Sequence, residues 1–256
     1  MFKRAIVRIP GSNFADGLTT VDLGIPRLDE VLKQHSFYCE ALRECGLELT
    51  VLEPDLRHAD STFVEDTAIL TPQCAILTRP GASTRAGEVT HIEPTLRAKF
   101  AQIHAIAAPG TVDGGDICQA DKHFFVGVSE RTNEQGAQQL CVLLAHAGFS
   151  SAIVDIRGVE GILHLKSGIS YLGDNRLVVI DALTEDPAFE GFEIVRVSPE
   201  ESYAANFLRI NEHVILSAGH PKFAATVRGF GYPVIELDMS EFQKMDGALS
   251  CLSLRF

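Results

Sequence analysis

The chain repeats one pattern of secondary structure along its length. Three stretches look alike: "ALRECGLELTVLEPD", "LLAHAGFSSAIVDIRG" and "TVRGFGYPVIELDMS". Each has the pattern of a helix end, a glycine that caps it, an apolar strand and an abrupt loop. Repetition on this scale is typical of folds that assemble copies of one supersecondary unit.

Paired short strands alternate with these stretches, and polar turn residues divide each pair, which indicates hairpins. The expected hairpins are 68–79, turning at Pro72-Gln73, 116–128, with Ala120-Asp121-Lys122 at the tip, 168–180, turning at Gly173-Asp174-Asn175, and 206–218, turning at Asn211-Glu212. A helix and a further strand are expected after each hairpin, with helices near 90–100, 132–147, 182–190 and 221–230 and strands near 103–107, 151–156, 193–197 and 233–237.

The two ends of the chain supply a fifth copy of the unit. Its expected parts are strands at 250–255, 4–9 and 48–52 and a helix at 27–45. Five units whose first and last ends meet predict an α/β fold with fivefold pseudosymmetry, closed into a ring through the N- and C-terminal strands. Such a ring is a single domain, residues 1–256.

Five polar loops follow the last strands of the units, and the pseudosymmetry predicts that they open at one end of the ring. They are 53–67, 108–115, 157–167, 198–205 and 238–249, and the last leads directly into Cys251. Binding and catalytic residues concentrate on loops that a rigid scaffold holds, so we expect the functional site at this end.

Composition excludes several classes of function. A net charge of −12 argues against nucleic-acid binding, and no apolar run is long enough to span a membrane. Pro10 and Gly11 interrupt the first apolar stretch before a secretory signal could form, and the six cysteines are scattered, so we expect a cytoplasmic protein with free thiols. Nucleotide-binding and zinc-protease motifs are absent, and no metal and no cofactor are expected.

Chemically active residues fall in or next to the five loops. Cys251 and His164 are candidates for a nucleophile and its acid/base partner, although each alone is more often structural. Four acids, Asp60, Glu65, Asp66 and Asp113, occupy two of the loops. Carboxylates that share one pocket repel each other unless a cation joins them, and guanidinium is a planar cation suited to carboxylates. Two arginines that follow hairpins, Arg85 and Arg131, are candidates for binding a substrate carboxylate.

Seven segments in order resemble the dimethylarginine dimethylaminohydrolase family: "DSTFVED", "RPGASTRAGE", "PGTVDGGDI", "FFVGVSERTNEQGA", "LHLKSG", "SYAANF" and "KMDGALSCLSLRF". The likeness runs essentially from residue 1 to 256. It implies the fivefold ββαβ propeller, or pentein, of the guanidino-group-modifying superfamily. It also implies a small-molecule methylarginine substrate and a possible homodimer.

The resemblance also implies a role for each matching position. Cys251 corresponds to the nucleophile, His164 to the general acid/base and Asp113 to its acidic partner. The substrate-binding positions it implies are Glu65 and Asp66 for the guanidinium, Arg85 and Arg131 for the carboxylate, and Asp60 with the backbone of Leu18 and Met245 for the α-amino end. Met245 departs from the family, which usually has a β-branched aliphatic residue there. Phe63 and Leu18 are candidates for an apolar wall that contacts the substrate methyl groups, with core packing an equal alternative for Phe63.

The activity that follows is hydrolysis of Nω-methylated arginines to citrulline and an alkylamine through a covalent cysteine S-alkylthiouronium. Two alternatives stay open. Arginine deiminase chemistry uses the same groups on unmethylated arginine, although those enzymes are longer. A binding protein without catalysis is the other, because the ring fold also occurs without an active site and fold alone does not decide function.

Overall fold

The structure, a computed structural model, describes all 256 residues and contains five sheets of three strands each. In every sheet the first two strands are antiparallel and the third runs parallel to the second. This repeated topology fits a fivefold pseudosymmetric α/β arrangement, as the sequence pattern predicts. The chain forms two compact units, Met1–Val64 with Asn206–Phe256, and Glu65–Ala205.

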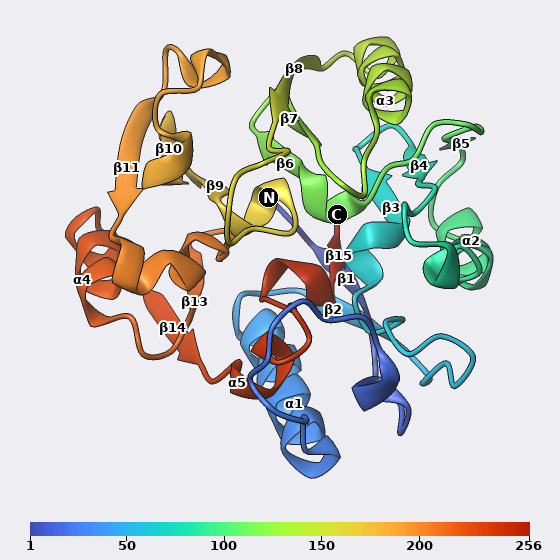
Figure 1. The fold of residues 1–256 in the computed structure, drawn as a ribbon, viewed down its shortest axis with the longest axis horizontal. Helices are drawn as coiled ribbons and strands as arrows, with labels where there is room; N and C mark the ends of the chain where they lie inside the picture. Colours follow the sequence, from blue (N-terminus) through green and yellow to red (C-terminus); the bar gives the residue numbers. More distant parts are fainter. The chain divides into compact units, whose positions relative to one another are not determined.

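The first unit contains two of the sheets. One joins β15 (Leu254–Arg255), β1 (Arg4–Arg8) and β2 (Glu48–Leu52), with α1 (Leu28–Glu44) between β1 and β2. The other joins β12 (Leu208–Ile210), β13 (His213–Ser217) and β14 (Val234–Leu237), with α4 (Pro221–Gly229) between the last two. The expected pairing of the two chain ends is confirmed, because Ala5 lies opposite Arg255 and Ile6 opposite Leu254 (Figure 1).

The second unit contains the other three sheets, with α2 and α3 before the third strands of the first two. The first sheet has β3 (Ala68–Leu70), β4 (Ala75–Leu77), α2 (Glu88–Arg97) and β5 (Ile103–Ala105). The second has β6 (Ile117–Ala120), β7 (His123–Val128), α3 (Glu134–His146) and β8 (Ser150–Asp155), and the third has β9 (Ile169–Gly173), β10 (Arg176–Ile180) and β11 (Glu193–Val197).

One predicted helix is wrong. Residues 182–190 form two short 3₁₀ turns, η6 (Asp181–Leu183) and η7 (Pro187–Phe189), in place of an α-helix. The reason is Pro187, which disfavours helical geometry in the residue before it. Asp186 is extended, with φ −68° and ψ 125°, and its carboxylate caps the second turn by accepting from Ala188 N. The helix expected between β10 and β11 is therefore replaced by these two short turns.

Polar turn residues placed the hairpins correctly. Asp121, Asn175 and Asn211, each in an expected turn, have φ values of 52°, 63° and 54°. Asparagine and aspartate tolerate this left-handed region better than other side chains.

The structure has no helix whose length and apolar character would let it span a membrane.

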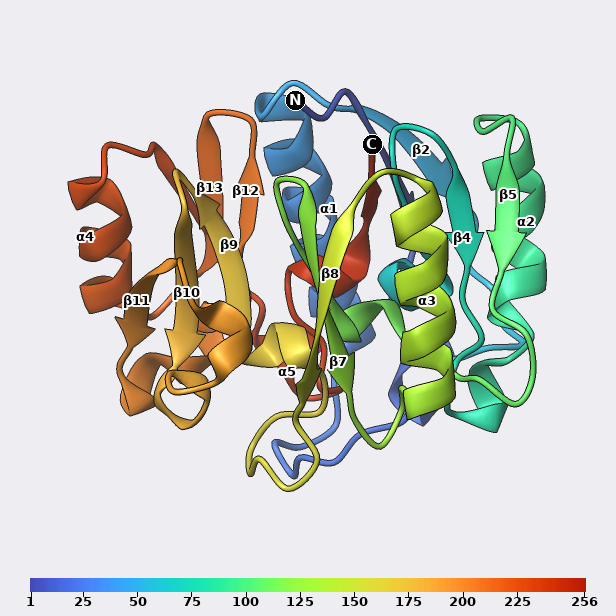
Figure 2. The ribbon, with the colours of Figure 1, turned by 90° about the horizontal axis from the view of Figure 1, so that it is seen from above.

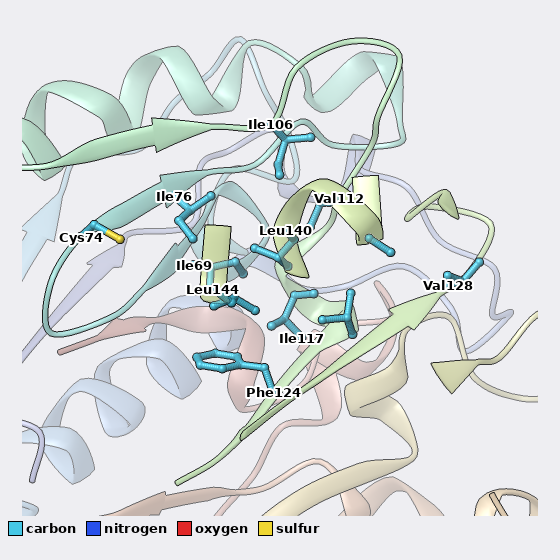
Figure 3. Close-up of a cluster of buried hydrophobic side chains, with 12 residues drawn as sticks. Ile69, Cys74, Ile76, Ile106, Val112, Ile117, Phe124, Val128, Leu140 and Leu144 are labelled. Atoms are coloured by element: carbon cyan, nitrogen blue, oxygen red, sulfur yellow. The ribbon is translucent and has the colours of Figure 1, made fainter. Parts of the chain in front are cut away.

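The apolar face of α3 forms the centre of a buried cluster in the second unit. Leu140 and Leu144 of α3 are fully buried and belong to a cluster with Ile76 of β4, Ile117 of β6 and Phe124 of β7 (Figure 3). Figure 2 shows α3 lying along β7 and β8. This packing joins two sheets of the unit, the one with β4 and the one with β6 and β7.

Replacement of Leu140 by alanine should lower the free energy of unfolding by about 2–5 kcal/mol, because it removes buried methyl groups and leaves a cavity. Urea unfolding monitored by circular dichroism measures the loss. Val142→Ala is the matched control, since Val142 lies on the same helix and is 55% exposed. Equal losses in the two variants would contradict the assignment of Leu140 to the core.

Candidate active site

Two of the predicted catalytic residues lie together in the unit Glu65–Ala205. His164 immediately precedes the turn η5 (Leu165–Ser167), and Asp113 immediately precedes the turn η4 (Gly114–Asp116). The His164 Nε2 atom lies 3.1 Å from Asp113 Oδ2, and the other oxygen of Asp113 accepts a 2.8 Å hydrogen bond from Gly81 N. Both side chains are buried. The pair can therefore hold or transfer a proton away from bulk water.

The surroundings of His164 favour its protonated form. Burial opposes the positive charge, but the carboxylates of Asp116, Asp66 and Asp113 outweigh this effect and raise the pKa of His164 to about 9. At neutral pH the imidazolium donates from Nε2 to Asp113, whose own pKa is lowered, against burial, by His164, Arg85 and Gly81 N. His164 is thus an acid with a proton to give.

Two glycines let the backbone of η4 approach its neighbours. A Cβ on Gly115 would lie 2.7 Å from Cγ and Nδ1 of the His164 ring, and one on Gly114 would collide with the carbonyl of Glu65. The amide of Gly115 donates a 2.7 Å hydrogen bond to Asp66 Oδ1. Only glycine leaves room for these contacts, so the sequence "DGG" brings Asp113, Asp66 and His164 into one cluster.

Arg85 is surrounded by carboxylates of the protein. Its Nη1 donates a 2.5 Å hydrogen bond to Asp66 Oδ2, and its Nε and Nη2 donate to Glu88, with the shortest contact 2.8 Å. All three side chains are buried. The sequence predicted Arg85 as a ligand for a substrate carboxylate; in the structure it is paired with Asp66 and Glu88.

The second acid of the predicted guanidinium pair also has a cation. Glu65 Oε1 lies 2.5 Å from Nζ of Lys166, and both side chains are largely buried. Arg131 differs from Arg85, because it is half-buried and forms no ion pair with a carboxylate of the protein. Its backbone amide donates to Ser129 Oγ at 3.0 Å. Of the two predicted arginines, Arg131 keeps its guanidinium available for a ligand.

Asp66, Asp113 and His164 have donor atoms close enough to share a metal ion. Their hydrogen bonds argue against that use. Asp66 binds Gly115 N and Arg85, Asp113 binds Gly81 N and His164, and an imidazolium has no lone pair to offer a metal. We assign no metal to this cluster.

In the first unit, three of the predicted residues lie together. The amide of Leu18 donates to both oxygens of Asp60, at 3.0 and 3.3 Å. A Cβ on Gly17 would lie 2.5 Å from Asp60 Oδ1 and 3.3 Å from Cε of Met245. Asp60 and Met245 are buried, and Leu18 is 38% exposed. The structure therefore gathers the groups expected around an α-amino end.

Cys251 lies on a 3₁₀ turn, η9 (Ser250–Leu252), which corrects the predicted strand at 250–255. Only Leu254–Arg255 pairs as a strand. The cause is local hydrogen bonding: Cys251 N donates to Ala248 O, and the side-chain amide of Asn206 donates to Ser250 Oγ and accepts from Ser250 N, both at 3.0 Å. The turn holds the half-buried thiol in a defined place.

Phe63 belongs to an aromatic cluster. Its ring centroid lies 5.9 Å from that of Phe14 and 6.4 Å from that of Phe242, and it is 5% exposed. These contacts favour the core-packing interpretation of Phe63 over contact with substrate methyl groups.

Sequence reasoning missed three groups of the site: the buried Glu88 and Asp116 and the half-buried Lys166. Glu88 and Lys166 neutralise Arg85 and Glu65, and Asp116 accepts hydrogen bonds from Ser129, Thr132 and Leu165. Asp116 and Lys166 stand in the singled-out segments "VDGGD" and "LHLKSG". Their closeness in sequence to Asp113 and His164 was the signal that could have identified them as residues of the site.

Comparison with known proteins places this geometry in a family. The sequence model of the arginine deiminase family matches residues 59–201. The chain is 44% identical, over its full length and that of the relative, to an N(G),N(G)-dimethylarginine dimethylaminohydrolase of Pseudomonas aeruginosa. It is 33% identical to one of Streptomyces coelicolor, over 99% of this chain and 96% of the relative.

Solved structures agree with the sequence comparison. The chain superimposes on the Pseudomonas aeruginosa dimethylarginine dimethylaminohydrolase, in a cysteine-to-serine variant complexed with citrulline, with a TM-score of 0.97 over both complete chains. A histidine-to-glycine variant in an adduct with S-methyl-L-thiocitrulline gives 0.96, also over both complete chains, and both are 44% identical to this chain. The N-terminal domain of a cyanobacterial arginine dihydrolase, 16% identical, covers 98% of this chain and 97% of its own with a TM-score of 0.86, which shows a shared fold.

Gly115→Ala should lower the pKa of His164 from about 9 towards its ordinary value of 6.5. The new methyl group would push the imidazole away from the carboxylates that stabilise its charge. NMR titration of labelled histidine measures this pKa without any substrate. Gly229→Ala is the control, because nothing lies within 4 Å of a Cβ there; an unchanged His164 pKa in Gly115→Ala would refute the steric argument.

Proposed function

The chain belongs to the dimethylarginine dimethylaminohydrolase family, and from this membership we propose that it hydrolyses Nω-methylated arginines to L-citrulline and dimethylamine or methylamine. The observation that carries the proposal is 44% identity over the whole of both chains with an enzyme of that name. The altered cysteine and histidine in the two solved dimethylarginine dimethylaminohydrolase structures are separated by the same number of residues as Cys251 and His164 here. This supports Cys251 as nucleophile and His164 as general acid/base.

In the first half-reaction the Cys251 thiolate attacks the guanidinium carbon. A carbon–sulfur bond forms, and His164 gives its proton to the methylated nitrogen as the carbon–nitrogen bond breaks and the amine leaves. The high pKa of His164 suits this step, since it enters with its proton in place. In the second half-reaction neutral His164 removes one proton from water and the oxygen adds to the same carbon. The carbon–sulfur bond then breaks, the thiolate departs, and the remaining hydroxyl proton passes to solvent to leave citrulline.

Carboxylates would orient the substrate guanidinium during the attack. Asp66 lies in the His164 cluster and Glu65 is its chain neighbour, so we assign this role to the pair. Bidentate pairing with carboxylates holds a planar guanidinium in a fixed orientation. Glu65 is paired with Lys166 and Asp66 with Arg85, so each acid has a cation of the protein beside it at its buried position.

The amino-acid end of the substrate would bind at two further places. Leu18, Asp60 and Met245 would hold the α-amino group, supported by the bond from Leu18 N to Asp60. Arg131 would bind the carboxylate, with Arg85 as a second, more deeply buried cation. The larger side chain of Met245 leaves this function intact if its backbone carbonyl makes the contact.

Residues 1–256 would act as one catalytic domain, closed into a fivefold ββαβ propeller. The match over the complete length of the Pseudomonas relative supports a single functional unit. The pairing of β15 with β1 supports closure through the chain ends. A cytoplasmic location fits the six free thiols, because reduced cysteines persist in that compartment.

Arginine deiminase chemistry is the second candidate, favoured by the match of the arginine deiminase family to residues 59–201. Citrulline release from asymmetric dimethylarginine, monomethylarginine and arginine separates the two. We expect kcat/KM to be about tenfold higher for the dimethylated substrate than for arginine, since each buried methyl contributes roughly 0.8 kcal/mol. If arginine is the best substrate, the deiminase alternative replaces our proposal; if none reacts, the protein is a binding protein.

Cys251→Ser should abolish citrulline formation while leaving the fold intact, because oxygen replaces sulfur with little change of shape. His164→Gly should instead accumulate the covalent adduct with S-methyl-L-thiocitrulline, whose thiol leaving group does not need the His164 proton, since the group that activates water is gone. Mass spectrometry of the quenched protein checks for added mass on the peptide that contains Cys251. Near-normal turnover by Cys251→Ser would overturn the assignment of the nucleophile.

Arg131→Lys should raise KM for methylarginines, because a lysine lacks the planar donor fork. The loss in binding should be on the order of 2–5 kcal/mol if the pairing is buried. A substrate analogue without the carboxylate provides the control and should respond little. An equal rise in KM for both compounds in Arg131→Lys would show that Arg131 is structural.

Arg85→Lys should raise KM and also lower the stability of the protein, since it disturbs the buried ion pairs of Arg85 with Asp66 and Glu88.

A further inference from the structure

Asp116 is a completely buried carboxylate that takes no part in the mechanism described above. It lies at the end of η4, three residues after Asp113. Its Oδ2 accepts hydrogen bonds of 2.7 Å from Ser129 Oγ and 2.6 Å from Thr132 Oγ1, and its Oδ1 accepts one of 3.0 Å from Leu165 N. One side chain thus joins three segments that are far apart in sequence.

Each of these bonds leads to a group assigned to the reaction. Leu165 follows His164 directly, so the bond to its amide fixes the backbone that carries the imidazole. Thr132 Oγ1 also accepts from the amide of Asp113 at 3.0 Å, so Asp116 holds Asp113 through a single hydroxyl. Ser129 Oγ accepts from Arg131 N and so connects Asp116 to the turn of Arg131.

We propose that Asp116 is the positioning residue of the acid/base pair: its buried carboxylate fixes the backbone of His164 through Leu165 N and the backbone of Asp113 through the Thr132 hydroxyl. This inference rests on the proposed function of His164. Asp116 itself touches neither the substrate nor the reacting atoms.

The geometry requires a carboxylate and not merely a polar side chain. All three partners donate to Asp116, and Ser129 Oγ already accepts from the amides of Arg131 and Thr132. An asparagine would have to point its NH₂ group either at the Leu165 amide, which is itself a donor, or at the filled Ser129 hydroxyl. In the first orientation the Leu165 amide loses its acceptor. In the second, the Ser129 and Thr132 hydroxyls lose the oxygen that both of them bind, so buried donors are left without an acceptor.

The charge of Asp116 acts on His164 through buried protein. Burial raises the pKa of Asp116, and His164 together with the bonds from Thr132, Ser129 and Leu165 opposes that rise. In turn, Asp116 has a larger effect than Asp66 or Asp113 in raising the pKa of His164. The ionised carboxylate and the imidazolium therefore stabilise each other.

Other titratable groups lie on His164's own turn and on the elements packed against it. Lys166 on η5 is paired with Glu65, and Arg85 acts on Asp113. Burial raises the pKa of the Cys118 thiol on β6 to about 12, which leaves it neutral. The remaining titratable side chains on these elements are His123 of β7, Tyr171 of β9, and Glu200, Glu201 and Tyr203 of η8 (Pro199–Ala205). None of them changes in the variants below, so a shift can be traced to Asp116.

The first test is the pKa of His164 in Asp116→Asn, measured by NMR of labelled histidine in the free protein. Loss of the negative charge should lower it from about 9 towards 6.5. The high-pH limb of kcat/KM for asymmetric dimethylarginine should move to lower pH with it, because the proton needed by the leaving amine is lost earlier. An unchanged His164 pKa in the folded variant overturns the proposal. The NMR result does not depend on activity, so failure of the wild type to form citrulline would count against the proposed function alone.

A second pair of variants keeps the proposal testable if Asp116→Asn does not fold. Thr132→Val removes the hydroxyl between Asp116 and Asp113 and should lower kcat by about tenfold to a hundredfold with a smaller change in KM, a part of the usual acid/base contribution. Thr132→Ser retains the hydroxyl and should restore kcat.

Thr71→Val is the matched control, because Thr71 is another buried threonine whose Oγ1 accepts a backbone amide, that of Cys74, in the β3–β4 turn. It should reduce thermal stability and leave kcat and the pH profile unchanged. If Thr132→Val and Thr71→Val have the same kcat at temperatures where both are folded, the link from Asp116 to Asp113 has no role in the reaction.

Discussion

The site in residues 65–205 depends on charge compensation among buried carboxylates. An ionised acid without a partner is very unfavourable in a protein interior. Here the compensation differs from one acid to the next: Asp66 has Arg85, Asp113 has His164, and Asp116 has two hydroxyls and an amide. The arrangement keeps negative charge in place for a cationic substrate and at the same time keeps a proton on the histidine.

This compensation explains why backbone and side chains approach so closely. Gly115 lies against the imidazole ring of His164 while its amide binds Asp66, and Gly81 donates to Asp113. Backbone amides stabilise carboxylates without adding a positive side chain that would compete with the substrate. The turns η4 and η5 therefore bring charge and rigidity to the same few residues.

Much of the fold could be predicted because its elements are locally encoded. Alternation of apolar residues, glycine caps and left-handed turn residues placed four hairpins and four of five crossover helices. The two exceptions have different causes, one local in sequence and one between distant residues. Pro187 breaks the fourth helix, and the amide of Asn206 binds Ser250 and holds Cys251 in a turn where an extended strand was expected.

Residue identity and order by themselves determined the repeated unit, the pairing of the chain ends and the set of candidate groups, because these follow from local pattern and from segments that match a family. Only the tertiary structure decided which cation or hydrogen-bond donor compensates the charge of each buried carboxylate. Arg85 lies between Asp66 and Glu88, and Asp116 binds the amide that follows His164. Such pairings join residues far apart in sequence, and a buried charge selects its partner by distance and desolvation, which no local pattern records.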